Sequence, residues 1–202
     1  MKTKNNSFGE VYVDFQVVQG FFHEDFSAVA KFLEKQLTQD GHGGASICVY
    51  HRGEKVVDIW GGSANNEGKP WQKDTMAISF STTKGVLTTA MHMLVDKGLC
   101  CFDDPVSSYW PEFGCNGKDK ITIRDLLSHR TGLYPISSLV SNIYELLDWE
   151  HMCELIAKSK PAIKPGKKPG YQAITYGWLV GELIRRITDK PVEQFVQDEI
   201  AK

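Results

Sequence analysis

The sequence has no uninterrupted apolar run of the ~18 residues that a membrane-spanning helix requires. Residues 1–7 are polar, and no apolar segment of the kind found in secretory signal peptides follows them. The formal net charge of −2 gives no electrostatic reason to expect nucleic acid or an anionic membrane as a partner. These absences predict a cytoplasmic protein that binds neither nucleic acid nor membrane.

Cysteine is also scarce, with five residues in 202. Their number is odd, Cys100 and Cys101 are adjacent, and none form a CxxC pair, so reduced thiols are favoured over a disulfide framework. The six histidines show no HExxH or other metal-ligand spacing. The chain also lacks a GxSxG nucleophile elbow, a Walker loop and a GxGxxG motif. We therefore expect neither a metal nor an organic cofactor.

What is present is a globular composition, with 42% apolar and 24% charged residues in a chain long enough for one substantial domain. Apolar periodicity and capping signals predict mainly helices. The expected helices cover about 25–40, 81–98, 143–159, 175–187 and 192–200, with a short helix after the capping box Thr122-x-x-Asp125.

Only one strand pair is expected, a hairpin of residues 45–50 and 55–60. An isolated pair of strands is marginally stable in water. Either residues outside this chain complete the sheet, or a partner chain covers the apolar faces.

The stretch from Ser81 to Lys84 opens the helix that Gly98 ends. Ser81 could simply be an N-cap. A capping box, however, calls for Glu or Gln where Lys84 stands, and a cation in the first turn opposes the helix dipole. Such a lysine lies on the same face as the serine and could accept a proton from its hydroxyl. Taken alone, Ser-x-x-Lys occurs about once by chance in a chain of this size.

Further motifs follow in a recognisable order. They are Asp103-Asp104-Pro105-Val106, the stretch Ile123-Arg124-Asp125-Leu126-Leu127-Ser128-His129-Arg130-Thr131-Gly132-Leu133, Pro165-Gly166 with Tyr171, and Tyr176-Gly177-Trp178-Leu179-Val180-Gly181-Glu182. Together they resemble the serine β-lactamase and penicillin-binding-protein-like superfamily, most closely the class C-related branch that includes family VIII carboxylesterases. The resemblance implies an α+β fold (an α/β sandwich of β-lactamase/transpeptidase type), here incomplete and mostly helical with an N-terminal hairpin.

The resemblance also implies roles for single residues. Ser81 matches the acylated nucleophile, Lys84 the lysine that helps to deprotonate it, and Tyr171 the tyrosine of the second motif. The backbone N–H of Ser81 matches one oxyanion-hole donor. The expected function is a serine hydrolase that acts through an acyl-enzyme on a small-molecule carboxylic ester. Whether Lys84 or Tyr171 is the base stays open.

Two departures from the family pattern matter. Ala173 stands where the second motif, usually Tyr-x-Asn, has its amide, which favours esters over lactams. The third motif, a Lys-Thr-Gly or His-x-Gly strand, is missing. The chain is therefore expected to be one truncated domain over 1–202, the N-terminal half of a longer enzyme, with a helical subdomain at about 99–170. A homo-oligomer or a complementary C-terminal region could complete it.

Two alternative functions remain. One is a β-lactamase or D-amino-acid peptidase, and the other is a non-catalytic fragment or interaction module. Among single residues, His129 is expected to be structural, although a triad with Ser81 and Asp125 is conceivable. Trp110 or Tyr134 could flank an acyl pocket. Asp103 and Asp104 are expected to cap the helix that follows them, and not to bind metal.

Overall fold

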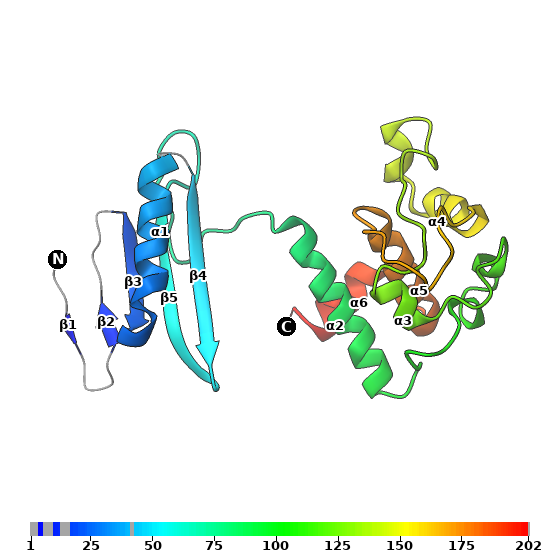
Figure 1. The fold of residues 1–202 in the computed structure, drawn as a ribbon, viewed down its shortest axis with the longest axis horizontal. Coiled ribbons are helices and arrows are strands. Elements are labelled where there is room, and N and C mark those ends of the chain that lie inside the picture. The colour runs from blue at the N-terminus through cyan, green and yellow to red at the C-terminus, as the bar shows by residue number, and fades with distance from the viewer. Residues whose placement is uncertain (1–3, 6–9, 13–16, 41–42, 202) are drawn as a thin grey trace. The chain divides into compact units, whose positions relative to one another are not determined.

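The structure, a computed structural model, describes residues 4–5, 10–12, 17–40 and 43–201. The chain divides into an N-terminal unit, residues 1–78, and a C-terminal unit, residues 79–202 (Figure 1). Most of the polar segment 1–7 lies outside the described residues. The helical subdomain expected at about 99–170 stays a prediction.

The N-terminal unit contains an antiparallel sheet with the strand order β1 (Lys4–Asn5), β2 (Glu10–Tyr12), β3 (Val18–His23), β5 (Glu54–Gly62), β4 (Gly44–His51). The predicted hairpin is confirmed as β4 (Gly44–His51) and β5 (Glu54–Gly62). Its turn places Arg52 and Gly53 at φ 51° and 84°. Positive φ at both central residues suits the right-handed twist of the paired strands.

The expectation that this hairpin is the only strand pair is wrong. β3 (Val18–His23) pairs with β5, and β2 (Glu10–Tyr12) and β1 (Lys4–Asn5) extend the sheet beyond it. Gly20 made β3 hard to predict, because glycine inside an apolar run usually weakens a strand. Here Gly20 has φ 113°, and a Cβ on it would lie 2.1 Å from the carbonyl oxygen of Asp58. Gly20 therefore permits a close approach of β3 to β5.

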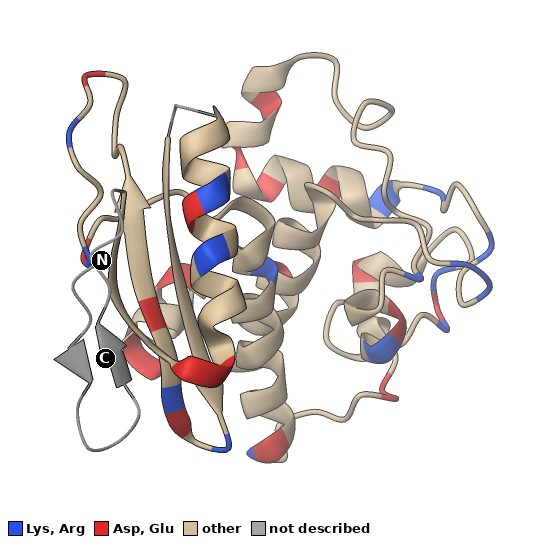
Figure 2. Ribbon diagram, turned by 60° about the vertical axis from the view of Figure 1, so that its left-hand side comes forward, with Lys and Arg blue, Asp and Glu red and all other residues tan. Residues whose placement is uncertain are grey.

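Helix α1 (Ser27–Asp40), preceded by the short 3-10 helix η1 (Glu24–Phe26), lies along this sheet (Figure 1). Figure 2 shows acidic and basic residues along the same helix. The apolar side chains between helix and sheet form a core of Val18, Phe22, Ala30, Leu33, Val57 and Ile59. The helix predicted at about 25–40 is thus confirmed; of Gly41-His42-Gly43-Gly44, the stretch expected to end it, the first two residues lie outside the described residues.

The C-terminal unit packs α2 (Thr83–Asp96) against α5 (Thr175–Thr188) and α6 (Val192–Glu199). The sequence spacing predicts one buried face of this helix, made of Val86, Leu87, Ala90, Met91, Leu94 and Val95. Of these, Ala90, Met91 and Leu94 are fully buried. Val86 is 37% exposed, so the predicted face is one residue too wide at its start. The helix ends before Gly98, which has φ 69° and follows the C-cap Lys97.

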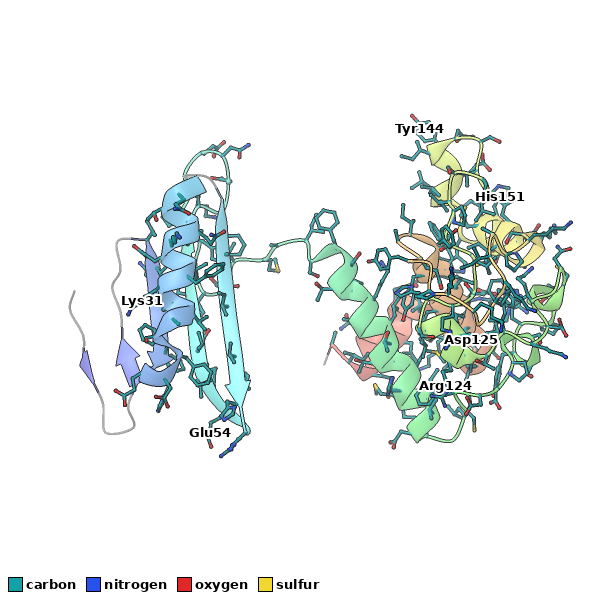
Figure 3. The ribbon with its side chains drawn as sticks, viewed as in Figure 1. Lys31, Glu54, Arg124, Asp125, Tyr144 and His151 are labelled. Atoms are coloured by element: carbon teal, nitrogen blue, oxygen red, sulfur yellow. The ribbon has the colours of Figure 1, made fainter. Side chains whose placement is uncertain are left out.

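The capping box Thr122–Asp125 is confirmed, and α3 (Ile123–Leu127) follows it. The helix expected at about 143–159 is divided in two. A 3-10 helix, η5 (Ile143–Leu147), ends at Asp148, whose carboxylate caps α4 (Trp149–Lys158). Tyr144, on η5, is 76% exposed at the outer end of the unit (Figure 3). Asx-type caps at Asn142 and Asp148 start the two segments separately.

The expected capping roles of Asp103 and Asp104 are wrong. The following segment, η3 (Val106–Ser108), has Pro105 at its N-cap position and no side-chain cap. Asp104 instead accepts hydrogen bonds from Cys101 N (2.7 Å) and from the hydroxyl of Tyr109 (2.6 Å). Asp103 pairs with Arg124 of α3. Both aspartates therefore tie the loop after α2 to neighbouring segments. A further 3-10 segment, η4 (Pro111–Gly114), follows η3.

Glu182 on α5 is a buried carboxylate that joins α5 to α4. Glu182 is 2% exposed and accepts hydrogen bonds from Arg185, Arg186 and Trp149, at 2.7 to 3.2 Å. Burial by itself raises the pKa of Glu182, but these hydrogen bonds outweigh it and lower the pKa to about 2. Because the folded pKa is depressed, this contribution to stability is present above the unfolded pKa of about 4.5 and is lost as pH falls towards 2.

We predict that Glu182→Gln lowers the free energy of unfolding by about 3 kcal/mol at neutral pH, since it leaves a buried ion-pair cluster without its anion. The matched control is Glu112→Gln, because Glu112 is 64% exposed and only bonds Arg186 from outside. Urea unfolding of both variants at pH 7 and pH 4 checks this. Equal stabilities of the two variants would contradict it.

Within the described residues, no helix is long and apolar enough to cross a membrane. All five cysteines are free thiols. The described part of the chain also places no three His, Cys, Asp or Glu side chains where they could hold a metal ion.

Candidate active site

Ser81 lies in the 3-10 turn η2 (Phe80–Thr82), immediately before α2. The preceding residue, Phe80, has φ 45°, a left-handed conformation that is unfavourable for a bulky side chain. Ser81 does not cap the helix: the cap positions are Ser79 and Thr82, and neither makes a side-chain cap bond. The simple N-cap interpretation of Ser81 is therefore wrong, and its exposed hydroxyl bonds other side chains.

The structure brings the three predicted site residues together. Ser81 Oγ lies 3.1 Å from Lys84 Nζ and 2.8 Å from the hydroxyl of Tyr171. The Ser81–Lys84 pair results from helical spacing, because residues three apart share one face. Tyr171 arrives from the loop between α4 and α5, about 90 positions along the chain.

Lys84 is held in place from several sides. Its Nζ donates a 2.7 Å hydrogen bond to the carbonyl oxygen of Ala173. The same nitrogen lies 5.0 Å from the ring centroid of Tyr171 and 5.9 Å from that of Tyr176. Aromatic faces at this distance attract a cation. Lys84 therefore points at Ser81 with its orientation fixed by contacts to the 171–176 segment.

The phenol of Tyr171 is 55% exposed, and its hydroxyl donates to Ser81 Oγ. The contact with Ser81 lowers the pKa of Tyr171, because the serine hydroxyl can turn and donate to the phenolate, and the nearby Lys84 lowers the pKa further. A phenol with a lowered pKa gives up its proton more readily near neutral pH. Ser81, Lys84 and Tyr171 thus form a continuous path along which one proton can move.

The structure shows what replaces the amide that is missing at Ala173. The main-chain carbonyl of Ala173 accepts the hydrogen bond of Lys84, so the lysine has an acceptor although the side chain is a methyl group. Residue types give no signal for this contact, because every residue carries a carbonyl. Tyr176, which the sequence predicts only as part of a motif and without a role, also lies beside the site: it is buried, and its hydroxyl hydrogen-bonds Thr88 at 2.7 Å.

A triad of Ser81, Asp125 and His129 is not formed. Asp125, labelled on α3 in Figure 3, accepts from the backbone and hydroxyl of Thr122 and lies 3.8 Å from Arg130. The Nδ1 atom of His129 accepts from Gln172 N at 3.2 Å. His129 is therefore engaged with the chain beside Tyr171, in line with the structural role expected for it.

A cavity of about 290 Å³ opens beside Ser81 and Lys84. Its remaining wall is mostly apolar, with Phe80, Leu87, Ala173 and Ile174 among the lining residues. Trp110 and Tyr134, the two candidates for an acyl pocket, are not part of it. Trp110 is buried against Phe113, and the ring of Tyr134 packs over Gly170.

Comparison with known proteins gives a consistent result. The Beta-lactamase family model matches residues 29–202. The chain is 36% identical over 178 residues to Esterase/beta-lactamase LipL of Mycobacterium tuberculosis, which covers 88% of this chain and 41% of that protein.

Solved structures agree with this match. A family VIII carboxylesterase superposes with a TM-score of 0.82 at 34% identity, covering 92% of this chain and 51% of the other. A penicillin-binding protein homologue from Caulobacter crescentus superposes with a TM-score of 0.85 at 33% identity, covering 91% and 50%. The chain thus spans about half the length of these relatives or less.

Proposed function

Because the chain belongs to the Beta-lactamase family, we propose that it is a serine hydrolase that cleaves carboxylic esters through an acyl-enzyme. The β-lactamase/transpeptidase-like α+β fold is confirmed by its structural neighbours. One observation carries the proposal: Ser81 Oγ lies within hydrogen-bond distance of both Lys84 Nζ and the hydroxyl of Tyr171. A serine hydroxyl is a weak nucleophile unless an adjacent base can remove its proton.

In the first half of the reaction, Ser81 Oγ bonds to the acyl carbon of the ester while its proton passes to Lys84 as the neutral amine or to Tyr171 as the phenolate, whichever of the two is deprotonated. The tetrahedral intermediate then loses the alcohol: the acyl carbon–oxygen bond breaks, and the departing oxygen takes up that proton. In the second half, a water oxygen bonds to the acyl carbon while the same base takes its proton; the acyl carbon–Ser81 Oγ bond then breaks, Oγ takes up that proton, and the carboxylic acid leaves. The pair next to Ser81 therefore acts as base and then as acid in each half.

The charge that develops on the carbonyl oxygen needs donors. The backbone N–H of Ser81, in the turn that precedes α2, is the donor that the family resemblance assigns. The positive end of the α2 dipole favours an anion at the same place. The family resemblance assigns a second donor to the third motif.

Esters are the proposed substrates because Ala173 offers no side-chain amide to a lactam or peptide, and because the cavity beside Ser81 is largely apolar. LipL carries both names, esterase and beta-lactamase, so the preference needs a direct measurement. Location in the cytoplasm and assembly into a homo-oligomer, or with a complementary C-terminal region, stay predictions.

We predict that kcat/KM for p-nitrophenyl butyrate exceeds that for nitrocefin by about a hundredfold, since a site that lacks a hydrogen-bonding group discriminates against the substrate that needs it. Ala173→Asn supplies the side-chain amide that the second motif usually has. We expect it to reduce the difference between the kcat/KM values for the two substrates. Both substrates are followed by absorbance with the two proteins side by side. Equal turnover of nitrocefin and the ester by the unmodified chain would favour the β-lactamase alternative.

A further inference from the structure

His129 binds the chain on both sides of Tyr171. Its carbonyl oxygen accepts a 2.8 Å hydrogen bond from Gly170 N, and its Nδ1 accepts a 3.2 Å hydrogen bond from Gln172 N. Gly170 and Gln172 are the immediate neighbours of Tyr171 in the sequence. His129, which follows α3, therefore fixes the backbone before and after Tyr171, whose phenol contacts Ser81.

The imidazole ring also faces the phenol itself. The ring centroid of His129 lies 5.0 Å from that of Tyr171 and 5.1 Å from that of the buried Tyr176, distances typical of packed aromatic pairs. His129 adopts φ 60°, an uncommon conformation for a residue other than glycine. A strained backbone of this kind persists only where surrounding contacts hold it.

The neighbouring Gln172 strengthens the same anchor. Its side chain is completely buried, and its Oε1 accepts from the hydroxyl of Thr131 at 3.2 Å. Thr131 lies two positions after His129, so the 129–131 turn and the 170–172 segment are joined at several points. The loop that carries Tyr171 is thus attached to the end of α3 rather than free to move.

We propose that His129 is a positioning residue, which sets the hydroxyl of Tyr171 against Ser81 by binding the main chain on both sides of Tyr171 and packing against its ring. The inference rests on the proposed function, because it assumes that Tyr171 moves a proton for Ser81. His129 itself touches neither Ser81 nor the reacting atoms.

This arrangement works only with a neutral imidazole, since Nδ1 must be unprotonated to accept from Gln172 N. Burial lowers the pKa of His129 and the positive charge of Lys84 lowers it further. The titratable groups that face the ring are Lys84 from α2, Tyr176 from α5 and Tyr171. Its sequence neighbour Arg130 points to Asp125. Protonation, which the lowered pKa shifts to a pH below the ordinary imidazole range, would turn Nδ1 into a donor and release Gln172.

The test compares His129→Ala with His129→Asn. Asparagine tolerates positive φ, and its Oδ1 can accept from Gln172 N without ever titrating. We expect His129→Ala to lower kcat for p-nitrophenyl butyrate by about 10–100-fold at little cost in KM. His129→Asn should recover most of that loss and should lack the fall in kcat that we expect of the unmodified chain at the acidic pH where His129 becomes protonated. His92→Asn is the control, because His92 is exposed on α2 and packs against Phe102.

A second measurement does not depend on catalysis. In amide NMR spectra, the Gln172 signal should titrate with His129 in the unmodified chain and should be independent of pH in His129→Asn. The inference would be overturned if the chemical shift of the Gln172 amide did not change as His129 ionises. Equal kcat values for His129→Ala and the unmodified chain would also overturn it. By contrast, the titration of Gln172 without any ester hydrolysis would count against the proposed function and leave the contact itself established.

Discussion

Replacement of Ser81 by alanine is expected to lower kcat for p-nitrophenyl butyrate by about 10⁴-fold or more, because the atom that forms the acyl-enzyme is removed. Ser81 is exposed and its hydroxyl bonds only two side chains of the site, Lys84 and Tyr171, in the structure. The substitution should therefore leave the fold unchanged. Steady-state hydrolysis and thermal unfolding, measured on the same preparation, check both statements.

Ser79→Ala is the matched control for this prediction. Ser79 lies two positions earlier, at the cap position of η2, and its side chain makes no capping bond. This variant should hydrolyse the ester like the unmodified chain. If Ser81→Ala and Ser79→Ala have the same kcat, then Ser81 is not the nucleophile.

The second large effect is expected from Tyr171→Phe. This substitution removes the hydroxyl that lies 2.8 Å from Ser81 Oγ and keeps the ring that packs against Lys84 and His129. Loss of one acid–base group typically costs about 10²–10⁴-fold in kcat, and we expect a fall in this range with KM little changed.

Tyr144→Phe serves as the control for Tyr171→Phe, because Tyr144 is 76% exposed on η5 and takes no part in the proposed site. The two variants are compared by steady-state kinetics over a range of pH. If Tyr171→Phe keeps full kcat, the proton must pass through Lys84 alone. Tyr171 would then carry no proton for Ser81.

The sequence predicted the side chains of the candidate site but not the main-chain atoms that contact them. Ser81 and Lys84 follow from helical spacing, and Tyr171 from the order of motifs. The carbonyl of Ala173, the hydrogen bond from Gln172 N and the positive φ of Phe80 could not be predicted, because they belong to backbone geometry that tertiary contacts impose. Only the acceptor of the Gln172 hydrogen bond, His129, carried a sequence signal, because it lies within the motif from Ser128 to Leu133.

The fold shows the same division between local and long-range information. The hairpin β4–β5 and the capping box at Thr122 are local features, and the sequence predicted both. β3 depends on pairing with β5, about 40 positions further along the chain, and Gly20 interrupts the apolar pattern that would have predicted a strand there. The break near Asp148 carried a readable signal, since Asp148 is a favourable N-cap within a run of helical apolar spacing.

The most direct test of the central claim is covalent labelling of the 202-residue chain with a fluorophosphonate probe, followed by mass spectrometry of the digested protein. We expect one adduct on the peptide that contains Ser81, absent from Ser81→Ala and formed more slowly in Tyr171→Phe. Absence of an adduct, or an adduct on another serine, would contradict a nucleophilic role for Ser81 in this chain and would favour the non-catalytic alternative.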